Sequence, residues 1–322
     1  MVSIKDVAKH AGVAISTVSK VLNNYPNISE STRKKVNEAV EELNFVPNSV
    51  AAALSSKNAG RAALMIDLNV TTQAIDEMAM RYISGAITKA MELNLDVITL
   101  FVFMFQDKTT EELIRYLQSQ SISGIIIYGA AEDDQLLRGL IASDQFKCVV
   151  IDDDYVSDNV SSVTIDHKKA QYEVAKVLIE ETGAKKVLYI RGDENSYVTR
   201  TRLEGIGELA EEKDLELIVE NAGFSENRAK EIALQYGKEA DVIICASDLM
   251  AIGAKNAMKQ MKIERPICGF DGISLMRYAG RGIYTIDQNF SQISAIAMEE
   301  LQQLMTGSPG KMIEADYSLV KN

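Results

Sequence analysis

Apolar positions at the N-terminal end of the chain repeat with the period of a helix. Over residues 3–22, apolar side chains recur at intervals of three and four, and Gly12 divides them into two runs. The first run contains Ile4, Val7, Ala8 and Ala11, and the second contains Val18, Val21 and Leu22. Two short helices joined by a turn that contains glycine are typical of a helix-turn-helix, whose second helix enters the DNA major groove. A helical hairpin without a nucleic-acid role is the alternative that this pattern leaves open.

A third helix is predicted directly after this pair. Asn23 and Asn24 end the second helix, and Ser29 is placed to cap the third, with the acidic Glu30 in its first turn. The apolar stripe of the third helix contains Val36, Ala39, Val40 and Leu43. The N-terminal part of the chain is therefore expected to form a small helical domain.

Beyond Gly60 the period changes. Short continuous apolar runs alternate with stretches of helical periodicity, such as residues 170–181 and 202–213. The predicted strands are Ala63–Leu68, Asp96–Phe103, Gly124–Tyr128, Cys148–Asp152, Ser162–Asp166, Lys186–Ile190, Leu217–Val219, Asp241–Ala246 and Pro266–Phe270. Apolar strands separated by helices indicate βαβ units around parallel sheets. The spacing alone leaves open one doubly wound sheet, two such sheets or a barrel.

Composition narrows the class of protein. The chain has 322 residues, of which 47% are apolar and 25% charged, as in ordinary globular proteins that hold more than one domain. No apolar run reaches transmembrane length, and the N-terminus lacks a signal-peptide pattern, so a cytoplasmic protein is expected. Three cysteines in apolar runs, Cys148, Cys245 and Cys268, are expected to be buried free thiols. A metal site is not expected, because His10 and His167 are the only histidines and no two cysteines are closely spaced.

The net charge of −12 is distributed unevenly. Residues 1–57 carry a formal charge of +2, whereas the remainder carries −14. A basic head on an acidic body favours contact of the head with DNA and disfavours non-specific contact of the body. Because +2 is a small charge, an uneven distribution without function is the alternative.

The motifs of both parts resemble those of the Lac repressor family of bacterial transcription regulators. In residues 3–54 the matching segments are I-K-D-V-A-K-H-A-G-V, T-V-S-K-V-L-N, I-S-E-S-T-R-K-K-V and F-V-P-N-x-x-A-x-x-L. In the body they are A-K-K-V-L-Y-I-R-G, R-x-R-L-E-G, C-A-S-D-L-M-A-I-G-A, I-C-G-F-D-G-I and Y-T-I-D-Q. The resemblance covers nearly the whole chain and is weakest from Asp67 to Lys108.

The resemblance implies an α/β protein with an all-helical head. The helix-turn-helix DNA-binding domain would span residues 1–46, and a hinge helix with its linker would span 47–59. A periplasmic-binding-protein-like body at 60–322 would consist of two Rossmann-like lobes with parallel sheets, joined by three crossovers. The first lobe would hold about 60–158 and 287–314, and the second about 159–286 and 315–322. The ligand would lie between them at the carboxyl ends of the strands.

The family's DNA contacts match residues of the head and the hinge. Ile15, Ser16 and Lys20 occupy exposed recognition-helix positions, where Lys20 suits guanine and Ile15 suits a thymine methyl group. The other expected DNA-binding residues are Ser3, Thr17, Ser19, Asn23, Asn48 and Leu54. In the family, the leucine that Leu54 matches wedges between base steps in the minor groove, and such wedges kink DNA. Residues 47–56 are too few for a stable isolated helix, so the hinge is expected to become helical on DNA; an ordinary alanine-rich linker is the alternative.

The family's effector contacts match polar residues at strand ends. Arg202 and Asp271 match an arginine and an aspartate that bracket ligand hydroxyls, because donors and acceptors can face the same edge of a sugar. The other expected effector-binding residues are Asp248, Ser247, Asp152, Gln288 and Thr71. Gly272 stands where the family often has a second acid.

Purely structural roles are the alternatives for the two central residues. Arg202 could form a surface salt bridge with Glu204 or Glu208, and Asp271 could cap a helix that begins near Ile273.

The expected function is that of a sequence-specific DNA-binding transcription regulator, acting as a repressor. Its operator affinity would be controlled by a sugar, a sugar phosphate or a nucleoside, without a cofactor or metal. The expected partners are a pseudo-palindromic double-stranded operator, the effector and a second copy of the chain, with no membrane. Because the chain ends at Asn322 without a heptad tail, a dimer is expected rather than a tetramer.

Three other classes of protein are alternatives. An enzyme is disfavoured, because the chain has no G-x-S-x-G elbow, no P-loop and no Cys–His pair in a matching context. A periplasmic-type sugar-binding protein is disfavoured by the head and by the missing signal peptide. A regulator whose body only dimerises and senses nothing stays open.

Overall fold

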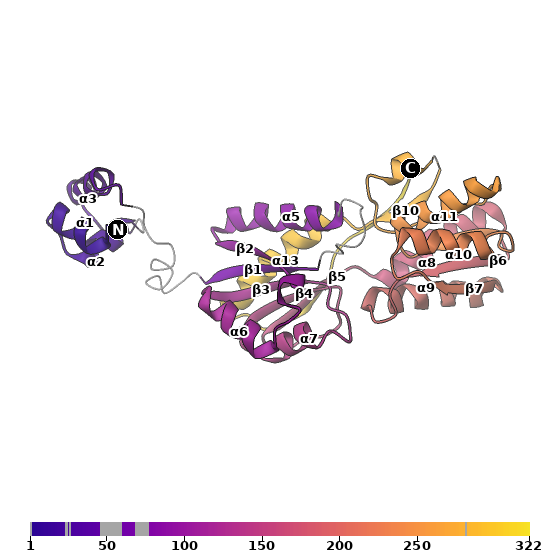
Figure 1. Cartoon of the computed structure of the whole chain (residues 1–322), viewed down its shortest axis with the longest axis horizontal. Helices are drawn as coiled ribbons and strands as arrows, with labels where there is room; N and C mark the ends of the chain where they lie inside the picture. Colours follow the sequence, from indigo (N-terminus) through magenta and orange to yellow (C-terminus); the bar gives the residue numbers. More distant parts are fainter. Residues whose placement is uncertain (1, 23–24, 26, 46–59, 68–76, 281) are drawn as a thin grey trace. The chain divides into compact units, whose positions relative to one another are not determined.

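The computed structural model describes residues 2–22, 25, 27–45, 60–67, 77–280 and 282–322. These fall into two compact units, residues 1–60 and 61–322 (Figure 1). Four residues with predicted roles, Asn23, Asn48, Leu54 and Thr71, lie outside the described residues. Among the described residues, no helix combines the length and apolar character that a membrane crossing requires.

The first unit contains the three predicted helices, α1 (Ile4–Ala11), α2 (Ile15–Leu22) and α3 (Glu30–Glu42). Gly12 ends α1 with a φ of 66°, and its N–H donates to the carbonyl of Ala8, a left-handed cap that glycine adopts without strain. The prediction that Ser29 caps α3 is confirmed, since its side chain accepts from the N–H of Thr32. The core of this unit is formed by Val7, Ala8, Val18, Val21, Val36 and Ala39.

The first sheet of the body has the strand order β11-β5-β4-β3-β1-β2, and all its strands are parallel. The strands are β1 (Arg61–Ile66), β2 (Val97–Phe101), β3 (Ile122–Tyr128), β4 (Lys147–Ile151), β5 (Val160–Thr164) and β11 (Met312–Glu314). The helices around it are α5 (Glu77–Leu93), α6 (Thr110–Ser119), α7 (Gln135–Ala142) and α13 (Phe290–Met305), with the short 3-10 helix η1 (Val102–Phe105). In Figure 1, α5 and α13 lie together on one face, and α6 and α7 on the other.

The second sheet has the order β12-β10-β9-β8-β6-β7, and only the β10–β12 pair is antiparallel. Its strands are β6 (Lys186–Arg191), β7 (Glu216–Asn221), β8 (Val242–Cys245), β9 (Ile267–Cys268), β10 (Tyr284–Asp287) and β12 (Ser318–Lys321). Its helices are α8 (His167–Thr182), α9 (Tyr197–Lys213), α10 (Glu226–Tyr236), α11 (Asp248–Met261) and α12 (Met276–Ala279). Of the arrangements that the spacing left open, the structure therefore adopts two separate sheets.

The chain passes between the two sheets three times, after β5, after β10 and after β11. One predicted boundary is wrong. The boundary at residue 158 assigned β5 to the second lobe, but β5 pairs in parallel with β4 in the first sheet, from Cys148↔Val160 to Ile151↔Val163. Below, lobe 1 means residues 61–165 and 288–314, and lobe 2 means residues 166–287 and 315–322. The boundary moves because pairing partners, rather than the apolar pattern, decide to which sheet a strand belongs.

Each predicted strand is present, with shifted ends. The run Asp96–Phe103 stops as a strand at Phe101, because its only neighbour β1 ends at the paired residue Ile66, and the chain continues as η1. The short strands β10, β11 and β12 had no matching prediction. Cys148, Cys245 and Cys268 are buried free thiols, as predicted.

Candidate DNA-binding and effector sites

The outer face of α2 carries the predicted base-contacting side chains. Ile15 is 43% exposed, and Ser16 and Lys20 are also exposed, whereas Thr17 and Ser19 are half-buried. Val18 and Val21 face the core of the head, so the helical period itself divides α2 into a packing face and a free face. This arrangement leaves one isoleucine, one hydroxyl and one ammonium group available to base edges.

Ser3 has a structural task at the start of α1. Its backbone N–H and its hydroxyl both donate to Oδ2 of Asp6, at 2.8 and 2.7 Å. These hydrogen bonds lower the pKa of Asp6, and they close the first turn of α1 in a reciprocal cap. If Ser3 contacts DNA as predicted, it must do so while it also caps α1.

In the body, the predicted effector residues lie at the carboxyl ends of strands from both sheets. Asp152 follows β4, Ser247 and Asp248 follow β8, Asp271 follows β9, and Gln288 follows β10. Arg202 comes from α9, the helix after β6. Ligands of open α/β sheets bind at this edge, so the topology brings residues distant in sequence to one place.

Arg202 is buried at the centre of this cluster, with 3% of its surface exposed. Its Nη1 donates to the carbonyl of Ala246 at 2.5 Å and lies 3.7 Å from Oδ1 of Asp271. The guanidinium carbon lies 3.8 Å from the centre of the Phe270 ring, a cation–π contact that strengthens when water is excluded. The alternative of a surface salt bridge to Glu204 or Glu208 is therefore wrong.

His167 holds the other side of the guanidinium, and sequence reasoning did not assign it to this site. Its Nδ1 lies 3.3 Å from both Nε and Nη2 of Arg202, and its Nε2 lies 2.8 Å from Oδ1 of Asp152. Burial lowers the pKa of His167, so the ring is neutral; Nε2 carries the proton and donates to Asp152, and Nδ1 accepts from Arg202. A histidine directly after the predicted strand Ser162–Asp166 was the signal available in the sequence.

Asp152 stays ionised in this setting. Burial by itself would raise its pKa, but the interactions with His167 and Arg202 and the hydrogen bond from the Thr164 hydroxyl hold its pKa below the usual range. Asp152 and Arg202 are thus connected through a neutral imidazole. This series of hydrogen bonds, from Asp152 through His167 to Arg202, fixes the plane of the guanidinium.

Asp271 is buried between Arg202 and Gln288. Nε2 of Gln288 donates to Oδ1 of Asp271 at 2.8 Å, while Oε1 of the same amide has no partner. Burial raises the pKa of Asp271 to about 7, although Arg202 opposes this rise. Asp271 does not cap a helix as the alternative required, because α12 begins at Met276 with Leu275 before it.

Asp248 and Ser247 serve the fold of lobe 2. The two carboxylate oxygens of Asp248 accept from the hydroxyl of Thr285 and from the N–H of Ile273, at 2.7 and 2.9 Å. Burial and the neighbouring Asp271 raise the pKa of Asp248 well above its usual range. Ser247 caps α11 by accepting from the N–H of Met250. Asp248 thus holds the loop that carries Asp271, whereas Ser247 fixes the start of α11.

Gly272 shows why a second acid does not fit in this loop. Its φ is +69°, and a Cβ atom at this position would lie 2.6 Å from Cα of Asp287. Both the backbone conformation and the close approach favour glycine. The departure from the family pattern is therefore built into the local backbone.

Polar contacts bridge the two lobes beside the cluster. The N–H of Glu132 in lobe 1 donates to the carbonyl of Asn195 in lobe 2, and the amide of Asn195 donates to Asp133, both at 2.8 Å. Arg200 of lobe 2 pairs with Asp154 at 3.1 Å and with Glu132 at 3.5 Å. The structure therefore has the two lobes in direct contact on this side.

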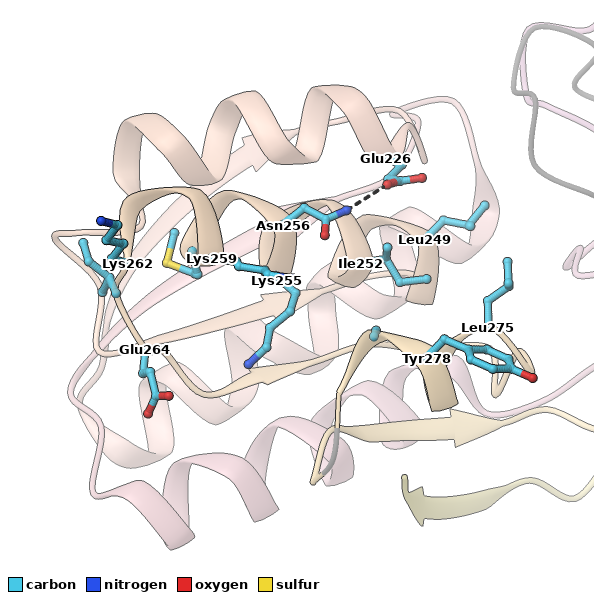
Figure 2. Close-up of a pocket in the computed structure, with 13 residues that line it drawn as sticks. Glu226, Leu249, Ile252, Lys255, Asn256, Lys259, Lys262, Glu264, Leu275 and Tyr278 are labelled. Carbon is cyan, nitrogen blue, oxygen red and sulfur yellow. Dashed lines mark hydrogen bonds between the residues drawn. The ribbon is translucent and has the colours of Figure 1, made fainter.

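A separate groove of about 640 Å³ lies along the outer face of α11. Figure 2 shows Lys255, Lys259 and Asn256 on this helix, with Leu275 and Tyr278 nearby. None of the described residues of the Arg202 cluster lines it. The groove lacks the buried arginine–carboxylate pair of the strand ends, so it does not coincide with the predicted effector site.

Comparison with known proteins supports both parts of the chain. The family described as "Bacterial regulatory proteins, lacI family" matches residues 3–48, and the family described as "Periplasmic binding protein domain" matches residues 141–309. The ribose operon repressor of Halalkalibacterium halodurans is 28% identical, with 96% of this chain and 92% of the relative covered. Catabolite control protein A of Staphylococcus aureus is also 28% identical, with 94% and 92% covered.

Solved structures share the fold over the full length. A Lac repressor dimer bound to operator and the anti-inducer ONPF has a TM-score of 0.82 at 24% identity, with 99% of this chain and 98% of that chain covered. A complex of the regulator CelR with cellobiose has a TM-score of 0.72 at 21% identity, with 100% and 99% covered. The predicted fold, a helix-turn-helix head with a periplasmic-binding-protein-like body, is confirmed. The curated relatives are transcription regulators, which confirms the prediction of a regulator rather than an enzyme, and the chain belongs to the lacI family of bacterial regulatory proteins.

Proposed function

We propose that this protein is a cytoplasmic transcription repressor that binds a pseudo-palindromic operator as a homodimer and responds to a small effector held between its lobes. The observation that carries the proposal is the presence, in one chain, of a head with a free recognition face and a body with a buried Arg202–Asp271–Gln288 cluster at its strand ends. The head supplies DNA contact, and the cluster supplies opposed donors and acceptors. A recognition face alone would not imply an effector, and a buried cluster alone would not imply DNA binding, so the proposal depends on both being present.

The cluster favours a ligand rich in hydroxyl or amine donors. The unpartnered Oε1 of Gln288 is an acceptor in a buried place, and a buried acceptor without a donor costs about 1–3 kcal/mol. Asp271 and Asp152 add carboxylate acceptors, and Arg202 adds donors. We assign direct ligand contact to Arg202, Asp271, Gln288 and Asp152. Asp248 is assigned the support of the Asp271 loop, and Ser247 the capping of α11.

Charge at the strand ends favours an uncharged effector over a phosphate ester. Five arginines near the strand ends each have a carboxylate partner within 4.0 Å; they are Arg81, Arg138, Arg191, Arg200 and Arg202. Residues 68–76, in lobe 1, contain neither lysine nor arginine in the sequence. A phosphate group with a charge near −2 would therefore face carboxylates without a free guanidinium among these residues. Among the expected effector classes, a free sugar or nucleoside fits best.

Exposed apolar side chains on lobe 1 support a homodimer. Met91 of α5 is 74% exposed, and β2 is the edge strand of the first sheet. The apolar strip that includes it consists of Met80, Ile87, Met91, Phe103 and Met104. A strip of this kind beside an edge strand is typical of a surface that another chain covers. On lobe 2, Tyr278 is 88% exposed and lines the groove of Figure 2.

The hinge at residues 47–56, which lies outside the described residues, would couple effector to DNA. A segment of this length is too short to be helical alone, so its order depends on DNA and on the spacing of the two copies. An effector that moves the lobes changes that spacing. The coupling needs only about 1–3 kcal/mol and must act in both directions.

A pair of binding measurements tests the proposal. Fluorescence anisotropy with palindromic DNA would show specific binding by the dimer, and free sugars should change the affinity. Ribose and cellobiose are the first probes, because a ribose operon repressor is among the relatives and a cellobiose complex among the similar structures. Arg202→Ala should abolish the sugar response and keep DNA binding, whereas Glu208→Gln, an exposed change on the same helix α9, should keep both.

Two results would contradict parts of the proposal. Specific DNA binding that no free sugar or nucleoside changes would mean that the body only dimerises. A response to ribose 5-phosphate without one to ribose would contradict the charge argument and leave the regulator intact.

A further inference from the structure

One contact joins the Asp271 loop of lobe 2 to a helix of lobe 1. Glu77 is the first residue of α5, and its carboxylate accepts from Ser274, which lies in the loop before α12. The backbone N–H of Ser274 lies 3.0 and 2.9 Å from the two oxygens of Glu77, and the hydroxyl lies 2.9 Å from Oε1. A carboxylate that takes both donors of one residue makes charge-assisted bonds in a defined geometry.

Arg81 makes a second contact one helical turn later. Its Nη1 donates to the carbonyl of Gly272, and its Nη2 pairs with Oδ1 of Asp287, both at 3.4 Å. On the lobe 1 side, the guanidinium carbon lies 5.5 Å from the centre of the Phe290 ring, and the hydroxyl of Ser291 donates to the backbone carbonyl of Arg81. Glu77 and Arg81 therefore contact both ends of the short segment 272–274.

Lobe 2 holds the same segment from the opposite side. The N–H of Ile273 donates to Asp248, and the N–H of Gly272 donates to the hydroxyl of Thr285. Asp271 itself has a φ of 118°, in the region that side chains other than glycine rarely adopt. A residue in such a conformation persists only when its surroundings hold it there. Two lobes supply these surroundings.

Helix α5 is fixed to the rest of lobe 1. A Cβ atom at Gly85 would lie 2.1 Å from the carbonyl oxygen of Ser291, so the backbones of α5 and α13 touch at this glycine. Ala79, Ala86 and Ala90 of α5 are buried. Small residues on the packing face allow close approach, and a helix packed in this way moves together with its lobe. A displacement of lobe 1 is therefore transmitted to Glu77 and Arg81.

We propose that Glu77 and Arg81 form an interlobe clamp that positions Asp271. They are positioning residues, because they act on the Asp271 loop and do not belong to the predicted ligand contacts. The clamp ties the closure of the lobes to the conformation of the loop, so that lobe opening releases the loop and loop rearrangement loosens the lobes. The role of Asp271 in effector binding rests on the proposed function, whereas the clamp depends only on contacts within the body.

Distance measurement between the lobes tests the clamp without an effector. Spin labels at Arg115→Cys on α6 and Glu231→Cys on α10 report on the lobes, and the native cysteines are buried. Glu77→Ala should broaden the distance distribution and shift it to longer distances. The matched control is Glu92→Ala, which removes an exposed carboxylate of the same helix that pairs with Lys89 within α5. Glu77→Gln keeps one acceptor oxygen for Ser274 and should give an intermediate distribution.

Hydrogen exchange tests whether the clamp positions the loop. In Glu77→Ala, the amides of Gly272 and Ile273, which do not bond to Glu77, should exchange about tenfold faster, which corresponds to about 1.4 kcal/mol. Exchange in the strand β6 should stay unchanged, as should the whole pattern in Glu92→Ala. An unchanged interlobe distance, or acceleration confined to the Ser274 amide, would overturn the proposal. Failure of the unaltered protein to bind any operator would instead contradict the proposed function and leave the clamp standing.

Discussion

Nε2 of His167 donates to Oδ1 of Asp152 across 2.8 Å, so the histidine that opens α8 is bound to the aspartate that follows β4. The other ring nitrogen faces Arg202. This pair fixes the tautomer of the imidazole, and the imidazole fixes the arginine. The effector cluster therefore depends on a residue that need not touch the effector.

Two replacements of His167 distinguish the contribution of its packing from that of its hydrogen bonds. In His167→Leu, Asp152 and Arg202 each lose a buried partner, and the free energy of unfolding should fall by about 1–3 kcal/mol. In His167→Gln, the amide can donate to one neighbour and accept from the other, so the loss should be smaller. Urea unfolding of both variants gives the comparison. Equal losses would show that the ring matters for its packing against Phe270 rather than for its hydrogen bonds.

Asp271 should make stability fall as the pH rises. Its pKa is about 7 in the folded chain, and an aspartate in an unfolded chain has a pKa near 3.9. Between these values the folded state holds a proton that the unfolded state has lost, so the stabilisation is complete below about pH 4 and disappears as the pH approaches 7. Asp271→Asn removes this dependence and keeps an acceptor for Gln288.

The melting temperature of Asp271→Asn relative to the unaltered protein should therefore shift in favour of the variant between pH 5 and pH 8. His167, Asp152 and Arg202 are present in both proteins, so their own titration largely cancels in the difference. Asp248 loses in the variant the part of its raised pKa that comes from Asp271, which shifts the melting temperature in the same direction. If the melting temperatures of the two proteins changed with pH in parallel over this range, Asp271 would have an ordinary pKa.

Lys20 should read a base rather than a phosphate. It lies on the exposed face of α2 and can donate to O6 and N7 of guanine. Lys20→Ala should relax the preference at one operator position by about 1–3 kcal/mol in a competition assay with single-base variants. Equal weakening on every sequence would identify a phosphate contact instead. Lys262→Ala, on the body, removes the same charge outside the head and serves as the control.

The apolar strip on lobe 1 should hold the dimer together. Met91→Glu or Ile87→Glu places a charge on the exposed side of α5 and should give monomers at micromolar concentration in light scattering, because burial of an unpaired charge is costly. Val219→Glu is the matched control: it changes an exposed apolar residue of β7, which is 40% exposed on lobe 2. A dimer that survives both changes on α5 would place the interface elsewhere.

Several site residues could be predicted before the fold was known. Asp271 and Gln288 stand in motifs at strand ends, and Arg202 stands in a motif that proved to lie inside helix α9 rather than at a strand end. The structure brings the three together with Asp152. Asp248 was expected to bind the effector, but both of its carboxylate oxygens accept hydrogen bonds within lobe 2. The motif shows that a polar residue follows a strand, but it does not show whether the oxygens of that residue are already bonded. Thr285 and Glu77 had no local signal, since their partners are remote in sequence.

The local features of this protein could be predicted from its sequence alone. The three head helices follow from apolar periodicity, from Gly12 and from the cap at Ser29, and the body strands follow from continuous apolar runs. Such features depend on neighbours within a few residues, which a linear pattern contains. Three relationships could be seen only in the folded chain: β5 belongs to the first sheet, His167 orients Arg202, and Glu77 reaches Ser274. These relationships join segments far apart in the chain, and they depend on strand pairing and lobe contact, which no local pattern encodes.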